Sequence, residues 1–156
     1  AKNITGRMQW SAIVATALGT VLGVVSTLVA DRIRWRRDTA ERDRDALRTV
    51  FMEYLTALTQ ARDAFSRAEP RPERVSKGHV VLGEHGVYAA QQQLELVAQR
   101  PVVERAGRAT LSVLDFHDVV VAGHEPDSVE YVRSWRAARE ARSVLIEEMK
   151  AALRRT

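Results

Sequence analysis

The sequence predicts an all-α protein in which one N-terminal transmembrane helix continues into a cytoplasmic antiparallel four-helix bundle. Two observations predict this fold. Residues 10–30 form a charge-free run of 21 residues, which at about 1.5 Å rise per residue matches the roughly 30 Å hydrocarbon core of a bilayer. From residue 46 onward, apolar side chains recur at intervals of three and four residues, in segments that prolines and glycines separate. The expected parts are a short external tail (1–9), the transmembrane helix (10–30), a charged helical stalk (31–45) and the bundle domain (46–156).

The charges on either side of the apolar run predict its orientation. Two Lys or Arg residues precede it, whereas six follow it by residue 44. Because cytoplasmic flanks carry the excess of Lys and Arg, we expect a single-pass protein of the bacterial cell membrane with its N-terminus outside and its C-terminal domain in the cytoplasm. A cleaved signal peptide is the alternative, but its apolar region spans only about 7 to 15 residues. The run is longer, and it ends at Asp31 and an arginine cluster.

The net charge of +4 is concentrated beside the apolar run. Between residues 46 and 156 there are 16 basic and 15 acidic residues, so the bundle lacks the basic surplus of a nucleic-acid-binding domain, and no nucleic-acid partner is expected. Only three of the 24 basic residues are lysines. This arginine bias is typical of GC-rich genomes and predicts an actinobacterial source. The absence of cysteine excludes disulfides and thiolate metal sites.

Small side chains recur at every fourth position of the transmembrane helix and predict a helix–helix interface. The row consists of Ser11, Ala15, Gly19, Gly23 and Thr27. Lipid gives helices no hydrophobic reason to pair, so association depends on the close approach that such rows permit. We therefore expect a homo-oligomer, or docking on another membrane protein, through this face. The alternative is that Gly and Ala are simply common in membrane helices.

The stalk is expected to remain helical, because residues 31–68 contain no Gly or Pro and the charges pair at helical spacing. Its polar residues surround the helix, which is typical of a solvated stalk or of a strip that lies on lipid head groups. The candidate head-group contacts are Arg32, Arg34, Trp35, Arg36 and Arg37. A simpler alternative is that these arginines only fix the membrane topology.

Four amphipathic helices are expected in the bundle domain, and the short connections between them imply antiparallel neighbours. Their expected ranges are about 46–68, 75–98, 101–123 and 128–154. The second is the weakest, because three glycines precede residue 87 and each lowers helix stability by about 1 kcal/mol relative to alanine. Its expected buried face consists of Val80, Val87, Gln91, Leu94 and Ala98.

Prolines, glycines and capping residues mark the expected helix ends. Neither Pro70 nor Pro72 fits a helix interior, so the first helix ends before them. Pro101 suits a first helical turn, and Gly123 suits a helix stop. The last helix takes its N-cap from Asp127 or Ser128.

No catalytic or metal-ligating signature accompanies these helices. Metal sites in bundles use inward ligands such as Glu-x-x-His, and none of the four histidines has that spacing. His117 lies on an expected apolar face, where a buried histidine bonded to a neighbouring carboxylate or carbonyl is the ordinary explanation. We expect no enzyme activity, no metal and no cofactor. A solvated face, rather than a site for an acidic partner, is expected for the arginines of the last helix, which are Arg133, Arg136, Arg139 and Arg142.

Several segments of the chain carry a resemblance. They are WSAIVATALGTVLGVVSTLVADRIRWRRD over 10–38, Tyr54-Leu55-x-x-Leu58, Gly86-Val87-Tyr88-Ala89-Ala90 and Leu94-Glu95-Leu96-Val97. In this order they are similar to a group of small actinobacterial single-pass membrane proteins with a C-terminal helical domain. The sharpest part of the resemblance is the membrane helix with its arginine flank. The resemblance implies a common architecture, and it implies no activity, cofactor or functional residue.

Two functions from different classes remain open. The first is a membrane-anchored, self-associating helical interaction or scaffold protein without a catalytic site. Its expected partners are membrane lipids, a second copy or another membrane protein, and a cytoplasmic protein. The second is a membrane effector or sensor, in which a ligand or signal in the bundle alters the packing of the membrane helix. The glycines at 78, 83 and 86 motivate this alternative, because they predict a loosely packed, adjustable helix.

Overall fold

The computed structural model describes residues 32, 34, 35 and 39–155, and every regular element in this part of the chain is helical. The all-α class is therefore confirmed. The chain divides into two compact units, 1–42 and 43–156. The transmembrane helix expected over 10–30 lies outside the described residues. Among the helices that the structure does describe, none combines the length and the apolar character needed to cross a bilayer.

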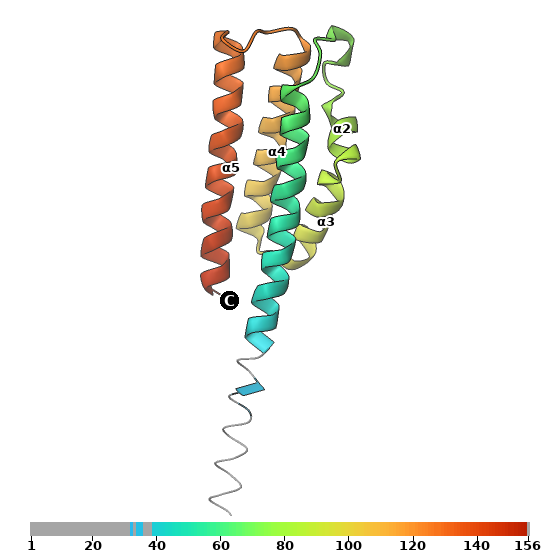
Figure 1. Cartoon of the computed structure of the whole chain (residues 1–156). Coiled ribbons are helices and arrows are strands. Elements are labelled where there is room, and N and C mark those ends of the chain that lie inside the picture. The colour runs from blue at the N-terminus through green and yellow to red at the C-terminus, as the bar shows by residue number, and fades with distance from the viewer. Residues whose placement is uncertain (1–31, 33, 36–38, 156) are drawn as a thin grey trace, which may run out of the picture. The chain divides into compact units, whose positions relative to one another are not determined.

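Long helices give the unit 43–156 a bundle-like form (Figure 1). Its elements are the helical residues 43–66, the 3₁₀ turn η1 (Pro72–Arg74), α2 (Gly78–Glu84), α3 (Val87–Val97), α4 (Arg100–Val121) and α5 (Val129–Arg155). In Figure 1, α5 runs back along α4, and α2 and α3 follow one another along one side of the bundle. The linker 67–77 meets the end of α4, where the Arg71 amide donates to the Val121 carbonyl at 2.8 Å.

Three chemical signals for helix ends are confirmed. Pro101 lies in the first turn of α4, and that helix ends before Gly123, which has a φ of 92°. The Tyr131 amide donates to Ser128 Oγ at 3.2 Å. Ser128, rather than Asp127, therefore caps the start of α5.

The helix expected over 75–98 is divided into α2 and α3. Gly86 has a φ of 71°, a left-handed conformation that interrupts an α-helix and that glycine adopts at little cost. The interruption changes which side chains face the core: Leu82 is fully buried, whereas 51% of Val80 is exposed. The expected burial of Val80 is therefore wrong, although Val87 and Leu94, which follow the break, are buried as expected.

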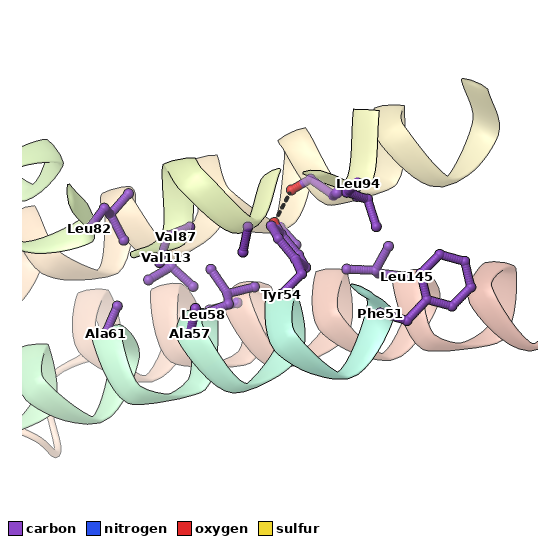
Figure 2. Packing of buried hydrophobic residues seen from close by; sticks show 14 of the residues in the cluster. Phe51, Tyr54, Ala57, Leu58, Ala61, Leu82, Val87, Leu94, Val113 and Leu145 are labelled. Atoms are coloured by element: carbon purple, nitrogen blue, oxygen red, sulfur yellow. Dashed lines mark hydrogen bonds between the residues drawn. The ribbon is translucent and has the colours of Figure 1, made fainter. Parts of the chain in front are cut away.

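The core extends along the bundle between all of its long helices (Figure 2). The buried side chains of the helical residues 43–66 include five that the spacing of three and four predicts, which are Phe51, Tyr54, Leu58, Ala61 and Phe65. Near the linker, the Phe116 ring of α4 packs 5.2 Å from the Tyr131 ring and 5.3 Å from the Trp135 ring of α5. The Arg62 guanidinium lies 4.9 Å from the centre of the Trp135 ring, an arrangement that attracts a cation to the aromatic face. These contacts fix α4, α5 and the first helix of the unit at the end where the linker begins.

Candidate functional site

A cavity of about 340 Å³ lies beside the linker 67–77. Most of its wall is apolar and comes from the end of the helical residues 43–66, from α2 and from α4. The lining residues are Ala64, Phe65, Ala68, Glu69, Arg71, Arg74, Val81, His117 and Val121. An apolar hollow with a few polar groups is the usual form of a small-molecule site. This cavity is therefore the candidate ligand site of the bundle.

His117 is the buried polar side chain of this cavity, with 3% of its surface exposed. Its Nδ1 lies 2.9 Å from Asp118 Oδ1. Because a carboxylate only accepts hydrogen bonds, this contact places the ring proton on Nδ1. The Phe65 ring stands edge-on to the imidazole, with 4.5 Å between the ring centres. A buried histidine bonded to a neighbouring carboxylate is what the sequence predicted, and this prediction is confirmed.

The second ring nitrogen of His117, Nε2, has no hydrogen-bond partner among the described residues. The Cγ–Nδ1 edge of the ring lies against Gly78, where an added Cβ would stand 2.8 Å from Nδ1. In the described part of the chain, only Arg44 and Arg142 have a fully buried side-chain nitrogen without a hydrogen-bond partner. Nε2 of His117 is not among these atoms, so it is not fully buried. In the neutral ring with its proton on Nδ1, Nε2 is a hydrogen-bond acceptor, and the imidazole forms part of the cavity wall.

Asp118 holds the linker as well as His117. The same oxygen that accepts from the imidazole also accepts from the Ser76 amide, at 2.8 Å. Ser76 has a φ of 63°, which is uncommon for a residue with a side chain and costs backbone energy. One carboxylate therefore couples the position of the linker to the orientation of the histidine.

The linker brings a surplus of positive charge to the cavity. Arg71 pairs with Glu69 at 3.1 Å, and both side chains are well exposed, at 48% and 79%. Such exposed pairs contribute little stability and rearrange easily. Arg74 forms no ion pair with any described residue. Two guanidinium groups and one carboxylate line the cavity, so its lining carries a net charge of +1 when His117 is neutral.

A second hollow, of about 430 Å³, lies on the outer face of α4 and α5. Leu111 and Val144 line it, although 60% and 40% of their surfaces are exposed. The arginines Arg105 and Arg108 lie beside them. A neighbouring hollow of about 590 Å³ continues along α5 and includes Arg133, Arg136 and Val129. We call this combined surface the α4–α5 groove.

The residues that the sequence proposed as membrane contacts lie in the unit 1–42. The small-residue row, Ser11, Ala15, Gly19, Gly23 and Thr27, lies outside the described residues, as do Arg36 and Arg37. Arg32, Arg34 and Trp35 are helical and exposed, and 68% of the Trp35 surface is exposed. Contact of these three side chains with head groups remains a prediction.

Sequence reasoning identified His117 but missed the cavity and its arginines. Arg71 and Arg74 lie on a linker with no periodicity, so nothing in the sequence places them against α4. The composition of the linker is the one available signal, because four of the eleven residues over 67–77 are basic and two are acidic.

No group of three or more His, Asp or Glu side chains within the described residues is placed to hold a metal ion. No family model, curated protein or solved structure matches the chain. The function of the chain is therefore inferred from its own residues.

Proposed function

We propose that the protein is a membrane-anchored, self-associating helical interaction protein without a catalytic site. In this proposal, residues 10–30 cross the bacterial cell membrane with the N-terminus outside, and residues 46–156 form an antiparallel four-helix bundle in the cytoplasm. The charge-free run and its arginine flank support the anchor. The single observation that carries the interaction function is the α4–α5 groove, because exposed apolar side chains gathered among charges are typical of a binding surface.

The α4–α5 groove fits one amphipathic helix with an acidic rim, supplied by a cytoplasmic partner protein. Leu111, Val129 and Val144 offer exposed apolar contacts, as the apolar face of a helix requires. The charged residues that line the two hollows are four arginines, Arg105, Arg108, Arg133 and Arg136, and two acids, Asp127 and Glu140. This surplus of two positive charges favours an acidic partner and repels a basic one. The sequence pattern favoured a solvated face for the arginines of α5, and the exposed apolar neighbours are the reason to propose a partner here.

Cross-linking in native membranes tests the groove. We expect Leu111→Asp with Val144→Asp to abolish capture of the partner, because the substitutions place charge on its apolar contacts. Leu96→Asp is the matched control, since 86% of Leu96 is exposed and it lies on α3, outside the groove. The cross-linked peptide of the partner should come from an acidic amphipathic segment. Equal capture by both variants, or a cross-linked segment that is basic, would contradict this assignment.

Self-association is proposed to use the small-residue row of the transmembrane helix. We expect Gly19→Leu with Gly23→Leu to convert the oligomer to monomer in mild detergent, because leucine keeps the backbones apart. Val21→Leu with Val25→Leu places leucines at the same spacing on the other face and should leave the oligomer intact. Light scattering of the full-length protein measures both. A monomeric wild-type protein, or an oligomer that survives the glycine substitutions, would show that this row is not an interface.

A second candidate function, a membrane effector or sensor, is favoured by the cavity beside His117. A ligand there would touch the helical residues 43–66, the linker and α4 together, and it would shift the packing if it preferred one arrangement. We expect a compound that occupies the cavity to change membrane potential in cells that express the wild-type protein. Cells expressing Val81→Trp, which fills the cavity, should not respond. An unchanged potential in wild-type cells when the cavity is occupied would argue against a sensor.

A further inference from the structure

We propose that the cavity beside His117 binds a small hydroxyaryl carboxylate, that is, a phenolic acid. This ligand class goes beyond the scaffold function. It deepens the second candidate, on whose sensing role its physiological meaning rests, but binding is measured without reference to any membrane effect.

The volume of the cavity, about 340 Å³, is that of a small-molecule site. It lies at the lower end of the range of about 300 to 1,000 Å³ for small-molecule sites. One six-membered ring with two small substituents fits this space.

The walls of the cavity favour an apolar, flat ligand body. Phe65, Val81 and Val121 line it from three different elements. Phe65 is 1% exposed and stands edge-on to His117, so its ring is held in place rather than free to fill the space. Aromatic rings pack favourably against such a fixed aromatic edge.

The linker arginines favour a single carboxylate on the ligand. A guanidinium group binds a carboxylate through two parallel hydrogen bonds, and Arg74 has no ion pair with any described residue to give up. The two guanidinium groups and one carboxylate of the lining sum to +1, which matches one negative charge when His117 is neutral. A phosphate monoester carries about −1.5 to −2 at neutral pH, so part of its charge would stay unmatched beside Glu69.

His117 favours a hydroxyl group at the buried end of the ligand. Asp118 fixes the proton on Nδ1, which leaves Nε2 as an acceptor without a partner among the described residues. A carboxylate at this position would bring two acceptors together, whereas an O–H group would donate to Nε2. The carboxylate is therefore assigned to the linker arginines and the hydroxyl to His117.

Calorimetric titration of the full-length protein in mild detergent tests the two polar contacts with three probes. We expect 4-hydroxybenzoate to bind at one site. The uncharged 4-hydroxybenzamide should bind at least about tenfold more weakly, because it loses the charge-assisted pair with arginine. Benzoate should bind about threefold to tenfold more weakly, because it lacks the hydroxyl group that donates to His117. No binding of 4-hydroxybenzoate, or equal binding of all three probes, would overturn the proposal.

Matched variants assign each contact to its residue. Arg74→Gln should weaken 4-hydroxybenzoate about tenfold and leave 4-hydroxybenzamide unchanged. Arg67→Gln removes the same charge from the same linker but does not line the cavity, so it should change neither affinity. The ring ¹⁵N resonance of His117 should move with 4-hydroxybenzoate and stay still with benzoate. An equal loss of affinity for 4-hydroxybenzoate in the two arginine variants would overturn the assignment. So would a His117 resonance that shifts equally with 4-hydroxybenzoate and with benzoate.

Cross-linking of the same samples separates this proposal from the proposed scaffold function. Binding of 4-hydroxybenzoate to a monomer would contradict self-association alone. An oligomer that does not bind 4-hydroxybenzoate would contradict the ligand assignment alone.

Discussion

Tyr54 places a hydroxyl group inside the core, where none of its surface is exposed. The hydroxyl lies 2.8 Å from the Ala106 carbonyl oxygen and 2.8 Å from Thr110 Oγ1, and Figure 2 shows its place among the apolar side chains. Because a carbonyl only accepts, the single phenolic proton goes to Ala106, and Thr110 donates to Tyr54. The hydroxyl group is therefore satisfied without water, as a buried polar group must be.

Tyr54→Phe should lower the free energy of unfolding by about 1 kcal/mol. The loss is modest because the Thr110 hydroxyl has a second acceptor, Gln91 Oε1, at 3.5 Å. Denaturant unfolding followed by circular dichroism measures it. Tyr88→Phe is the matched control, since Tyr88 is 38% exposed, and it should change stability little. A loss above about 3 kcal/mol would instead indicate that Thr110 is left unsatisfied.

Burial also makes Tyr54 a source of instability at high pH. Desolvation raises the pKa of its hydroxyl from 10 to about 12, and the hydrogen bond from Thr110 offsets part of that rise. As the pH rises, the unfolded chain therefore releases this proton at a lower pH than the folded chain does. The contribution of the neutral Tyr54 hydroxyl to the free energy of unfolding is complete below pH 10. It is lost between pH 10 and 12, and the loss is about 3 kcal/mol at most. Unfolding free energies measured over this range should fall more steeply for the wild type than for Tyr54→Phe. Parallel curves would refute the assignment to Tyr54.

Gly78 is required by the position of His117. An added Cβ would meet His117 Cγ and Leu114 Cδ2, both at 2.9 Å, and this crowding displaces the ring from Asp118. Gly78→Ala should therefore destabilise the protein by about 1 to 3 kcal/mol. Gly107→Ala, inside α4 with no atom within 4 Å of the added Cβ, should stabilise it by up to about 1 kcal/mol. Thermal unfolding of both variants gives the comparison, and a stabilised Gly78→Ala would show that Gly78 is not tightly packed against His117 and Leu114.

At the scale of elements, the junction between α2 and α3 depends on the backbone of Gly86. Alanine at its φ of 71° costs roughly 1 to 2 kcal/mol, so Gly86→Ala should lower the thermal stability. Gly83→Ala, three residues earlier and inside α2, brings its Cβ only to 3.9 Å from the Tyr88 ring, and it should be neutral or stabilising. If both variants gained stability, α2 and α3 would be able to join as one helix.

The ends of α4 and α5 were predictable because residues with a local effect mark them. The expected ranges 101–123 and 128–154 differ by at most two residues from Arg100–Val121 and Val129–Arg155. Pro101 acts on its own backbone, and Ser128 acts on an amide three residues away. The break at Gly86 was not predictable in the same way, because glycine permits a positive φ without requiring it. The positive φ of Gly86 is adopted because it lets both Leu82 and Val87 pack against the rest of the core.

The candidate site shows the same limit of sequence reasoning. Burial of His117 follows from its place on the apolar face of α4, and its partner Asp118 is the next residue in the chain. The cavity also needs the linker, which is held by long-range bonds such as Ser76 to Asp118, 42 residues apart. Neither helical periodicity nor turn chemistry specifies a contact at that separation.

At the scale of the whole molecule, the positive charge is concentrated near the N-terminal end of the chain. The bundle range 46–156 carries a balance of only +1, so the remaining +3 lies in residues 1–45. Within that stretch, the arginines gather on the C-terminal side of the predicted transmembrane helix. Lys and Arg close to a span determine which flank stays in the cytoplasm, whereas distant charges contribute little.

This distribution predicts the topology, and a chain without cysteine allows a direct measurement. We expect Thr5→Cys, in the external tail, to react with a membrane-impermeant maleimide on intact bacterial cells. Ser143→Cys, on the exposed surface of α5, should react only after lysis. When Arg34, Arg36 and Arg37 are replaced with glutamine, part of the Ser143→Cys protein should react with the maleimide on intact cells, because the charge bias that keeps this flank in the cytoplasm is removed. Labelling of Ser143→Cys on intact cells before any arginine is removed would place the bundle outside, and the proposed cytoplasmic partner would have to be abandoned with it.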